Sequence, residues 1–157
     1  MKDFKYLDLI ESIKQEFKID YYGDHGINHW RRVYSNTQKL STHYNIESEV
    51  FELFALLHDS KRHDELEDKH HGKRAALFTE ELLTNEVIAL NEEDAKRLLY
   101  ACANHTHSDK NNPLFYDRVI QICFDSDRLD IGRVGYNVDV SYLATDYAKS
   151  LVVDGNI

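Results

Sequence analysis

His58 and Asp59 stand side by side at the end of the apolar run Val50 to Leu57. Two ionisable side chains in such a place are costly to bury unless a partner compensates them. A divalent metal ion accepts both an imidazole nitrogen and a carboxylate oxygen. The pair therefore predicts a metal site at the end of a buried helix.

Further residues of metal-ligand type occur at separate points of the chain. They are His29, His71, His105 and Asp127. Each falls on the apolar face of its own predicted helix and near one of its ends, as His71 does relative to Ala75 and Leu82. Helix ends from separate parts of a chain can meet around one cavity, so these residues are candidate ligands of the same site.

Each candidate also has a simpler interpretation when it is considered alone. An inward histidine is more often a hydrogen-bonded core residue than a metal ligand. Asp127 could cap a helix or pair with Arg118 or Arg128, and Asp59 could cap the following turn. The metal interpretation is favoured because the alternative needs several separate polar placements, each with its own compensation.

The elements that must position these residues are read from apolar periodicity. We expect helices over residues 4–17, 25–44, 47–59, 70–83, 91–105, 114–127 and 140–151, with loops at 60–69 and 132–137. Helix 47–59 is apolar on nearly all sides and should be the most buried. One proline and six glycines leave little room for the turns of an all-β fold. The prediction is an all-α, single compact domain over residues 1–157, of about six to seven helices, with the metal site between helix ends.

Composition restricts the classes of partner. The net charge of −9 argues against broad binding of a nucleic-acid polymer, which needs a basic face. No apolar stretch approaches the roughly 20 residues of a membrane span, and residues 1–6 lack the apolar core of a signal peptide. Cys102 and Cys123 lie in apolar helical patterns and suggest buried free thiols. We therefore expect a cytoplasmic protein.

Three ordered motifs resemble those of a known family. His29-Trp-Arg-Arg-Val33, Leu57-His58-Asp59 and Asp127-Arg-Leu129 resemble the ordered His, His-Asp and Asp motifs of the HD-domain superfamily of metal-dependent phosphohydrolases. The resemblance covers about residues 22–135, leaving 136–157 as a C-terminal helix and tail. The stretches 25–33 and 123–134 further resemble a small bacterial subfamily. The resemblance implies an HD-type helical domain and four shared metal ligands: His29, His58, Asp59 and Asp127.

Some members of that superfamily add two histidines and hold a second metal ion. His71 and His105 match those positions, and Asp59 would then bridge both metals. His70 and His107 lie close to these two in the sequence and are alternative candidates for the same ligand positions. Position 70 falls about 100° from the apolar face, which favours His71 over His70. Ligands without thiolate suit one or two divalent transition metal ions, namely Mn, Fe, Co, Ni or Zn, with Mg possible.

Several cations and one further histidine are candidates for contacts with a substrate. Arg62 occupies the position of a basic residue often found three after the aspartate of the pair, although it could equally be a solvated charge. Lys73 and Arg74 begin a helix, where amide groups also favour anions. Arg32, Arg128 and Arg133 are plausible phosphate contacts, although each alone is better explained as an ion-pair partner.

His25 precedes His29 by one helical turn and could donate a proton to a leaving oxygen. Its alternative roles are a cap or a hydrogen bond to Asp24. Asp130 could orient Arg133 or a ligand, while Asp125 should point elsewhere. A base could stack on one of the aromatic residues Tyr21, Tyr22, Trp30, Tyr116 and Tyr136, most of which are better explained by packing.

The leading interpretation is a hydrolase of a nucleotide or another small phosphate ester, using water activated by metal. One alternative is a di-iron oxygenase, because some HD proteins use the same ligands for oxidative cleavage. Another is a metal-binding or nucleotide-binding module without turnover. The expected partner is a small phosphorylated molecule, with no membrane and no nucleic-acid polymer, and a homodimer is possible.

Overall fold

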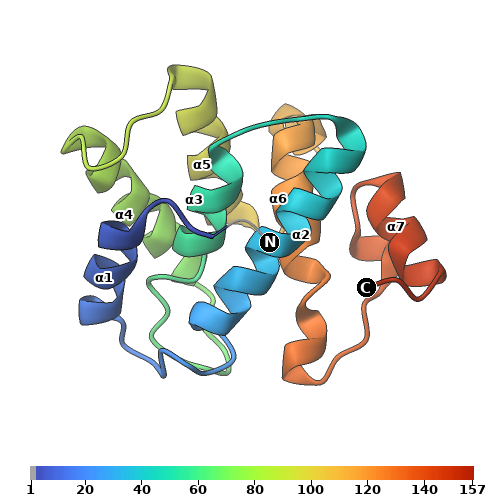
Figure 1. Ribbon diagram of the computed structural model, residues 1–157, viewed down its shortest axis with the longest axis horizontal. Helices are drawn as coiled ribbons and strands as arrows, with labels where there is room; N and C mark the ends of the chain where they lie inside the picture. Colours follow the sequence, from blue (N-terminus) through green and yellow to red (C-terminus); the bar gives the residue numbers. More distant parts are fainter. Residues whose placement is uncertain (1–2) are drawn as a thin grey trace.

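The structure, a computed structural model, describes residues 3–157, which form helices joined by loops (Figure 1). Within these residues there are seven α-helices, three short 3₁₀ helices and no strand. The α-helices are α1 (Leu7–Glu16), α2 (Ile27–Tyr44), α3 (Val50–Leu57), α4 (His71–Thr84), α5 (Glu92–Asn104), α6 (Arg118–Arg128) and α7 (Asp146–Val153). The 3₁₀ helices are η1 (Pro113–Tyr116), η2 (Ile131–Val134) and η3 (Val140–Tyr142). The all-α prediction is confirmed.

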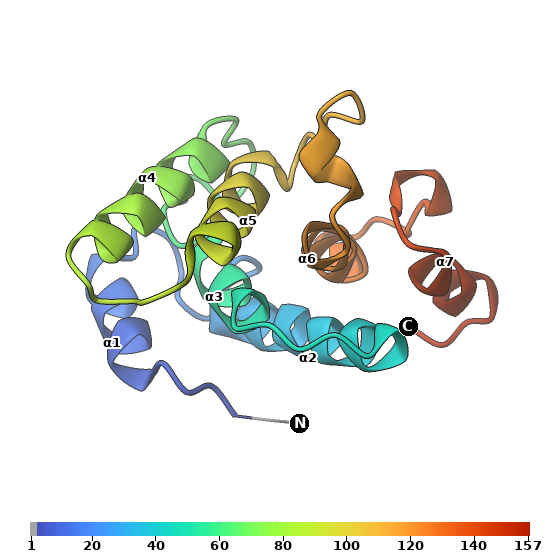
Figure 2. The same ribbon diagram turned by 90° about the horizontal axis from the view of Figure 1, so that it is seen from above.

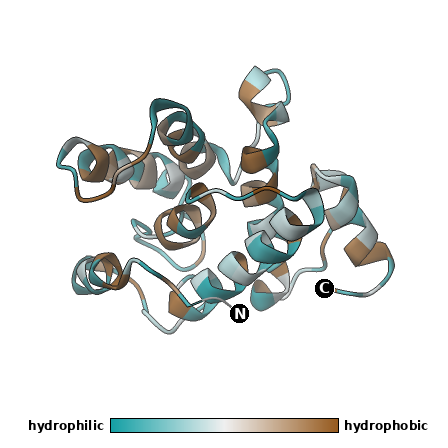
Figure 3. Ribbon diagram, turned by 45° about the horizontal axis from the view of Figure 1, so that its top comes forward, coloured by the Kyte–Doolittle hydropathy of each residue, from teal (hydrophilic) through white to brown (hydrophobic). Residues whose placement is uncertain are grey.

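Helix α3 is the centre of the fold. All eight of its residues are buried, and α2, α4, α5 and α6 surround it (Figure 2). The surrounding helices turn their apolar faces inward and their polar faces outward (Figure 3). The one charged residue of α3, Glu52, accepts hydrogen bonds from the backbone N–H groups of Lys5 and Tyr6 and from the Tyr34 hydroxyl. These bonds compensate the buried carboxylate and tie the N-terminal segment to the core.

Two glycines permit close approaches that place the site residues. A Cβ on Gly72 would lie 2.7 Å from the carbonyl oxygen of Cys102, so α4 can approach α5 this closely only without a side chain there. This contact brings His71, at the start of α4, next to the end of α5. A Cβ on Gly26 would lie 1.9 Å from the carbonyl oxygen of Tyr21, where the chain turns into α2.

Two of the predicted helices are each divided into two shorter elements in the structure. The span 114–127 is divided, because the Asp117 carboxylate accepts hydrogen bonds from the N–H groups of Val119 and Ile120 and so starts α6 at Arg118. The span 140–151 is divided for a similar reason, since Thr145 caps α7. The predicted loop at 132–137 is partly η2, and α2 begins at Ile27, so His25 lies before it.

The predicted buried thiols are confirmed, and Asn91 caps the start of α5. Cys102 and Cys123 are buried and free, and Asn91 accepts a hydrogen bond from the N–H of Asp94. Among the helices of residues 3–157, none has both the length and the apolar content needed to cross a membrane.

Candidate metal centre

The six candidate ligands come from the ends of five helices and meet beside the end of α3. His29 is in the first turn of α2, His58 and Asp59 follow α3, and Asp127 lies in the last turn of α6. His71 is the first residue of α4, and His105 follows α5 directly. His29, His58 and His71 are buried, as are Asp59 and His105.

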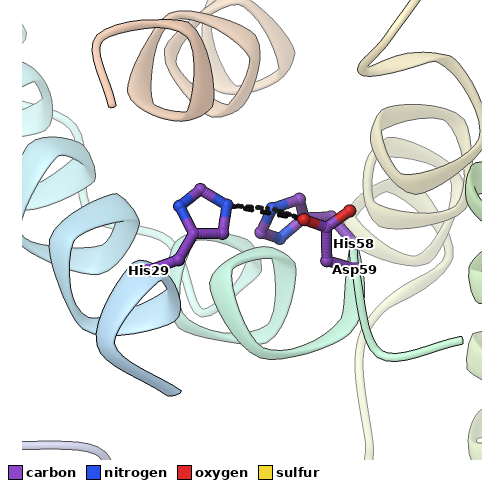
Figure 4. Close-up of side chains that lie close together, drawn as sticks. All are labelled: His29, His58 and Asp59. Carbon is purple, nitrogen blue, oxygen red and sulfur yellow. Dashed lines mark hydrogen bonds and ion pairs between the residues drawn. The ribbon is translucent and has the colours of Figure 1, made fainter. Parts of the chain in front are cut away.

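One group of ligand atoms lies between α2, α3 and α6. The Nε2 atoms of His29 and His58 are 3.0 Å apart, and Asp59 Oδ2 lies 3.6 Å and 3.7 Å from them. Figure 4 shows the two imidazole rings and the Asp59 carboxylate turned toward one another. Asp127 Oδ1 approaches the same two nitrogens, at 3.3 Å and 3.7 Å. Two nitrogens and two carboxylate oxygens therefore surround one point.

A second group lies on the other side of the Asp59 carboxylate. Asp59 Oδ1 is 3.2 Å from His71 Nε2 and 3.7 Å from His105 Nε2. The two Nε2 atoms are 2.8 Å apart. The two oxygens of Asp59 thus face different groups, which is the arrangement that a bridging ligand needs.

Hydrogen bonds to neighbouring carbonyl and carboxylate groups determine which nitrogen of each of the four imidazole rings carries the proton. His58 Nδ1 donates to the carbonyl of Phe54 at 2.9 Å, and His105 Nδ1 donates to the carbonyl of Cys102 at 2.8 Å. A carbonyl can only accept, so these rings carry their proton on Nδ1 and present the Nε2 lone pair inward. The same holds for the other two rings, where Nδ1 of His71 donates to the Asp68 carbonyl and Nδ1 of His29 donates to the Asp130 carboxylate.

The inward lone pairs of the histidines and the two carboxylates gather more acceptors than the surrounding donors, such as Arg62 Nη1 at 3.3 Å from His71 Nε2, can satisfy. Asp59 Oδ1 and Asp127 Oδ1 are buried and have no hydrogen-bond partner among residues 3–157. Unsatisfied buried oxygens are rare in folded proteins and need an explanation. Unpaired carboxylate oxygens beside imidazoles that are oriented by carbonyl or carboxylate groups fit divalent metal ions. His29, His58, Asp59 and Asp127 would hold one ion, and Asp59, His71 and His105 would contribute to a second.

Without a metal ion, protons must compensate the same acceptors. Burial opposes a charge on His58, but the Asp59 and Asp127 carboxylates outweigh it and raise the pKa of this imidazole. Burial also raises the pKa of the Asp59 and Asp127 carboxyl groups. The charge and hydrogen bonds of neighbouring histidines outweigh it and hold both pKa values well below the usual range. Burial lowers the pKa of His105.

Of the two further aspartates near the end of α6, only Asp130 holds a histidine in place. Asp130 Oδ2 accepts from His29 Nδ1 at 2.7 Å, while its Oδ1 accepts from Arg32 Nε at 2.7 Å. Asp130 therefore orients a ligand, one of its two predicted roles, and contacts Arg133 only through its backbone carbonyl. Asp125 points elsewhere, as predicted, and binds the N–H groups of Ala144 and Thr145.

A cavity of about 920 Å³ opens over the two groups. Its wall includes three of the predicted phosphate contacts, namely Arg62, Arg128 and Arg133. Arg62 is buried rather than solvated, with Nη1 3.5 Å from Asp59 Oδ1. His25 also lines the cavity, with Nδ1 3.1 Å from Asp59 Oδ2 and Nε2 3.1 Å from the carbonyl of Glu65. The alternative hydrogen bond from His25 to Asp24 is not among these contacts.

The structure does not bring the other three predicted cations to this cavity. Arg32 is half-exposed and pairs with Asp130. Lys73 is exposed on α4, and Arg74 turns away to pair with Asp68. Neither of the last two lines the cavity wall, because the first turn of α4 directs only His71 toward Asp59. The structure therefore gives no support to these three predicted substrate contacts.

The aromatic candidates are also mostly elsewhere. Trp30 is fully buried and donates to the carbonyl of His25, and Tyr21 packs edge-on against it. Of the five predicted stacking residues, Tyr136 is the one that lines the cavity. Tyr142, which the sequence analysis missed, lines it as well. Asp68 was also missed, because a backbone carbonyl that orients His71 leaves no signal in the residue type.

The neighbours His70 and His71 provide a matched test of the second group. His71 is buried beside Asp59, whereas His70 is exposed. We expect His71→Ala to lower the metal content from about two ions to about one per chain while the fold persists. Elemental analysis of the purified variants measures this. His70→Ala should retain the full metal content, and an unchanged content in His71→Ala would contradict the second group.

No protein-family model and no curated protein sequence matches the chain. Its fold is similar to that of a crystal structure of a predicted HD superfamily hydrolase from an uncultured Thermotogales bacterium. The two chains share 25% sequence identity and superpose with a TM-score of 0.69, over 98% of this chain and 87% of the other. This match extends along nearly the whole chain and, with the His and Asp residues gathered as described, it supports assignment of the protein to the HD-domain superfamily.

Proposed function

We propose that the protein is a metal-dependent phosphohydrolase that acts on a nucleotide or another small phosphate ester. The proposal rests on metal-ligand atoms and guanidinium groups that occur together at one cavity. Two groups of metal-ligand atoms share Asp59, and three guanidinium groups, those of Arg62, Arg128 and Arg133, line the same wall. The neighbouring structure, which is described as a predicted hydrolase, supports the same class of reaction.

Seven carboxylates and four cationic side chains line this cavity, so bound divalent metal ions, together with the arginines, would be needed to favour an anionic substrate. Arg128 is the clearest candidate for a phosphate contact. Its Nη2 donates to the carbonyl of His105 at 3.3 Å and to Ser108 Oγ at 3.1 Å. Its Nη1 is buried and has no hydrogen-bond partner within the described chain. A guanidinium group with a free N–H is suited to bind a phosphate oxygen.

Metal ions held here would polarise phosphate oxygens and lower the pKa of a water molecule. Residues of the chain would position the substrate and stabilise its charge, because phosphoryl transfer depends mainly on these two contributions. Arg128 and Arg133 would orient the phosphate. His25, which faces the cavity beside Asp59, is our candidate for delivering a proton to the leaving oxygen.

The size of the cavity is appropriate for a small molecule. A volume of about 920 Å³ is near the upper end of the range for ligand pockets. Tyr136 and Tyr142, each 69% exposed, stand in its wall and offer flat surfaces to the part of the substrate that leaves.

The proposal is tested by assays on protein stripped of metal and reloaded with Mn, Fe, Co, Ni, Zn or Mg. We expect release of phosphate from p-nitrophenyl phosphate or nucleoside monophosphates with at least one of these metals. Arg128→Met should lower kcat/KM by about tenfold to a hundredfold. Arg118→Met is the matched control, since Arg118 lies over the ring of Tyr44, away from the cavity wall.

Two results would contradict the proposal. Consumption of oxygen by the iron form without release of phosphate would identify an oxygenase that uses the same ligands. Tight metal binding without turnover of any phosphate ester would identify a binding module.

A further inference from the structure

A second cavity lies on the outside of the molecule, apart from the metal-ligand groups. It has a volume of about 520 Å³ and opens between the end of α1 and helix α4. These two helices lie at the same edge of the molecule in both Figure 1 and Figure 2. The lining residues are Glu16, Lys18, Ser60, Lys61, Arg62, His63, Arg74, Leu77, Phe78 and Glu81. Of these, Arg62 also lines the cavity over the metal-ligand groups.

This cavity is basic in an acidic protein. Four of its lining residues are lysine or arginine and two are glutamate. Lys61 pairs with the exposed Glu16 at 2.7 Å, whereas Lys18 has no ion-pair partner among residues 3–157. The local potential also acts on His63, whose pKa is lowered by partial desolvation and by the positive charges of Arg74 and Lys18.

Two apolar side chains of α4 also line the cavity. Phe78 is half-buried in the floor, and Leu77 is 61% exposed beside it. The Lys61 ammonium lies 3.9 Å from the centre of the Phe78 ring. A ligand that carries an anionic group could therefore pair with the cations while its apolar part covers Phe78 and Leu77.

We propose that this cavity is an effector site for a small phosphate-bearing molecule with an apolar or aromatic part. The anionic group binds among Lys18, Lys61 and Arg74, and the apolar part packs on Phe78. Because the two glutamates leave a net positive charge, a dianion is favoured over a neutral ligand of the same shape.

The contacts around the cavity connect it to the second group of metal-ligand atoms. Arg74 pairs with the Asp68 carboxylate and also donates to the carbonyl of Lys61 at 3.0 Å. The Asp68 carbonyl is the group that orients His71. An anion that competes with Asp68 for Arg74 would loosen this support of His71. Binding at the outer cavity should therefore weaken the metal ion that His71 helps to hold.

The test is isothermal titration of phenylphosphonate, which has a ring and a dianionic group and no ester bond to hydrolyse, into the metal-loaded protein. We expect binding at two classes of site, one at the metals and one at the outer cavity. Lys18→Glu should weaken only the second class, by about tenfold. Leu77→Asp should weaken the same class, and Lys96→Glu, an exposed lysine on α5, is the matched control for the charge change.

The coupling is measured by titrating metal with and without saturating phenylphosphonate. We expect the affinity for the second metal ion to fall about fivefold or more in the wild type and in Lys96→Glu, and to fall less in Lys18→Glu. A single class of phenylphosphonate site, or two classes that Lys18→Glu and Leu77→Asp leave unchanged, would overturn the effector site. Equal falls in metal affinity in all three proteins would overturn the coupling. Since neither measurement uses turnover, both outcomes are independent of the proposed phosphohydrolase activity.

Discussion

Replacing Asp59 by asparagine is expected to empty both metal positions at once. Its two carboxylate oxygens face different groups, 3.6 Å from His29 Nε2 and 3.2 Å from His71 Nε2. Asparagine has nearly the same shape but lacks the charge and offers only one oxygen. We expect the metal content to fall from about two ions per chain to nearly none, and phosphate release to fall about a thousandfold or more.

Asp125→Asn is the matched control for this change. Asp125 is also buried near the end of α6, but its carboxylate binds the N–H groups of Ala144 and Thr145 and the Thr145 hydroxyl. Its replacement should cost about 1–3 kcal/mol of folding stability and leave the metal content unchanged. Full metal content in Asp59→Asn, measured in the same way, would contradict the assignment of Asp59 as the shared ligand.

Removing the metal ions is expected to lower thermal stability, and by more at higher pH. In the metal-free protein the raised pKa of His58 contributes stability that is fully present below its unfolded value, about 6.5, and is lost as the pH rises through the raised value. Metal binding needs the neutral imidazoles and so becomes stronger over the same range. The difference in Tm between the metal-loaded and chelator-treated proteins should therefore widen from about pH 5.5 to about pH 8.

Differential scanning calorimetry across this range measures the effect. A free metal concentration about a thousandfold above Kd corresponds to about 4 kcal/mol of stabilisation. His70→Ala should give the same curves as the wild type, because His70 is exposed. A difference in Tm that is constant with pH would show that the histidines do not hold the metal.

In acidic solution the carboxyl groups of Asp59 and Asp127 determine how the folding stability of the metal-free protein changes with pH. The lowered pKa values of Asp59 and Asp127 contribute stability that is present above their unfolded values, near 4, and is lost as the pH falls through the lowered values. Together with His58, they place the greatest stability of the metal-free protein in mildly acidic solution.

Apolar periodicity was sufficient to predict most of the helices and the place of the site between their ends. The preference for His71 over His70 needed only the 100° that separates neighbouring residues of a helix, and the structure buries the first and exposes the second. The breaks at Asp117 and Thr145 were missed because both residues also occur inside helices, and only their bonds to the next backbone N–H groups reveal them as caps.

The surroundings of the ligands could not be predicted from residue types. The carbonyl groups of Phe54 and Cys102 fix the protons of His58 and His105, and any residue in those positions carries a carbonyl. The close approach at Gly72 depends on how two helices cross. The direction in which a long cationic side chain points could not be predicted either. Arg62 turns toward Asp59, whereas Arg74 turns toward Asp68.

Anomalous diffraction from crystals grown with Mn²⁺ would reveal whether two metal ions share Asp59. We expect two anomalous peaks on opposite sides of the Asp59 carboxylate, one near His29, His58 and Asp127 and the other near His71 and His105. A single peak beside His58 would remove the second ion. The absence of any peak at Asp59 in crystals that contain manganese elsewhere would contradict the metal centre itself.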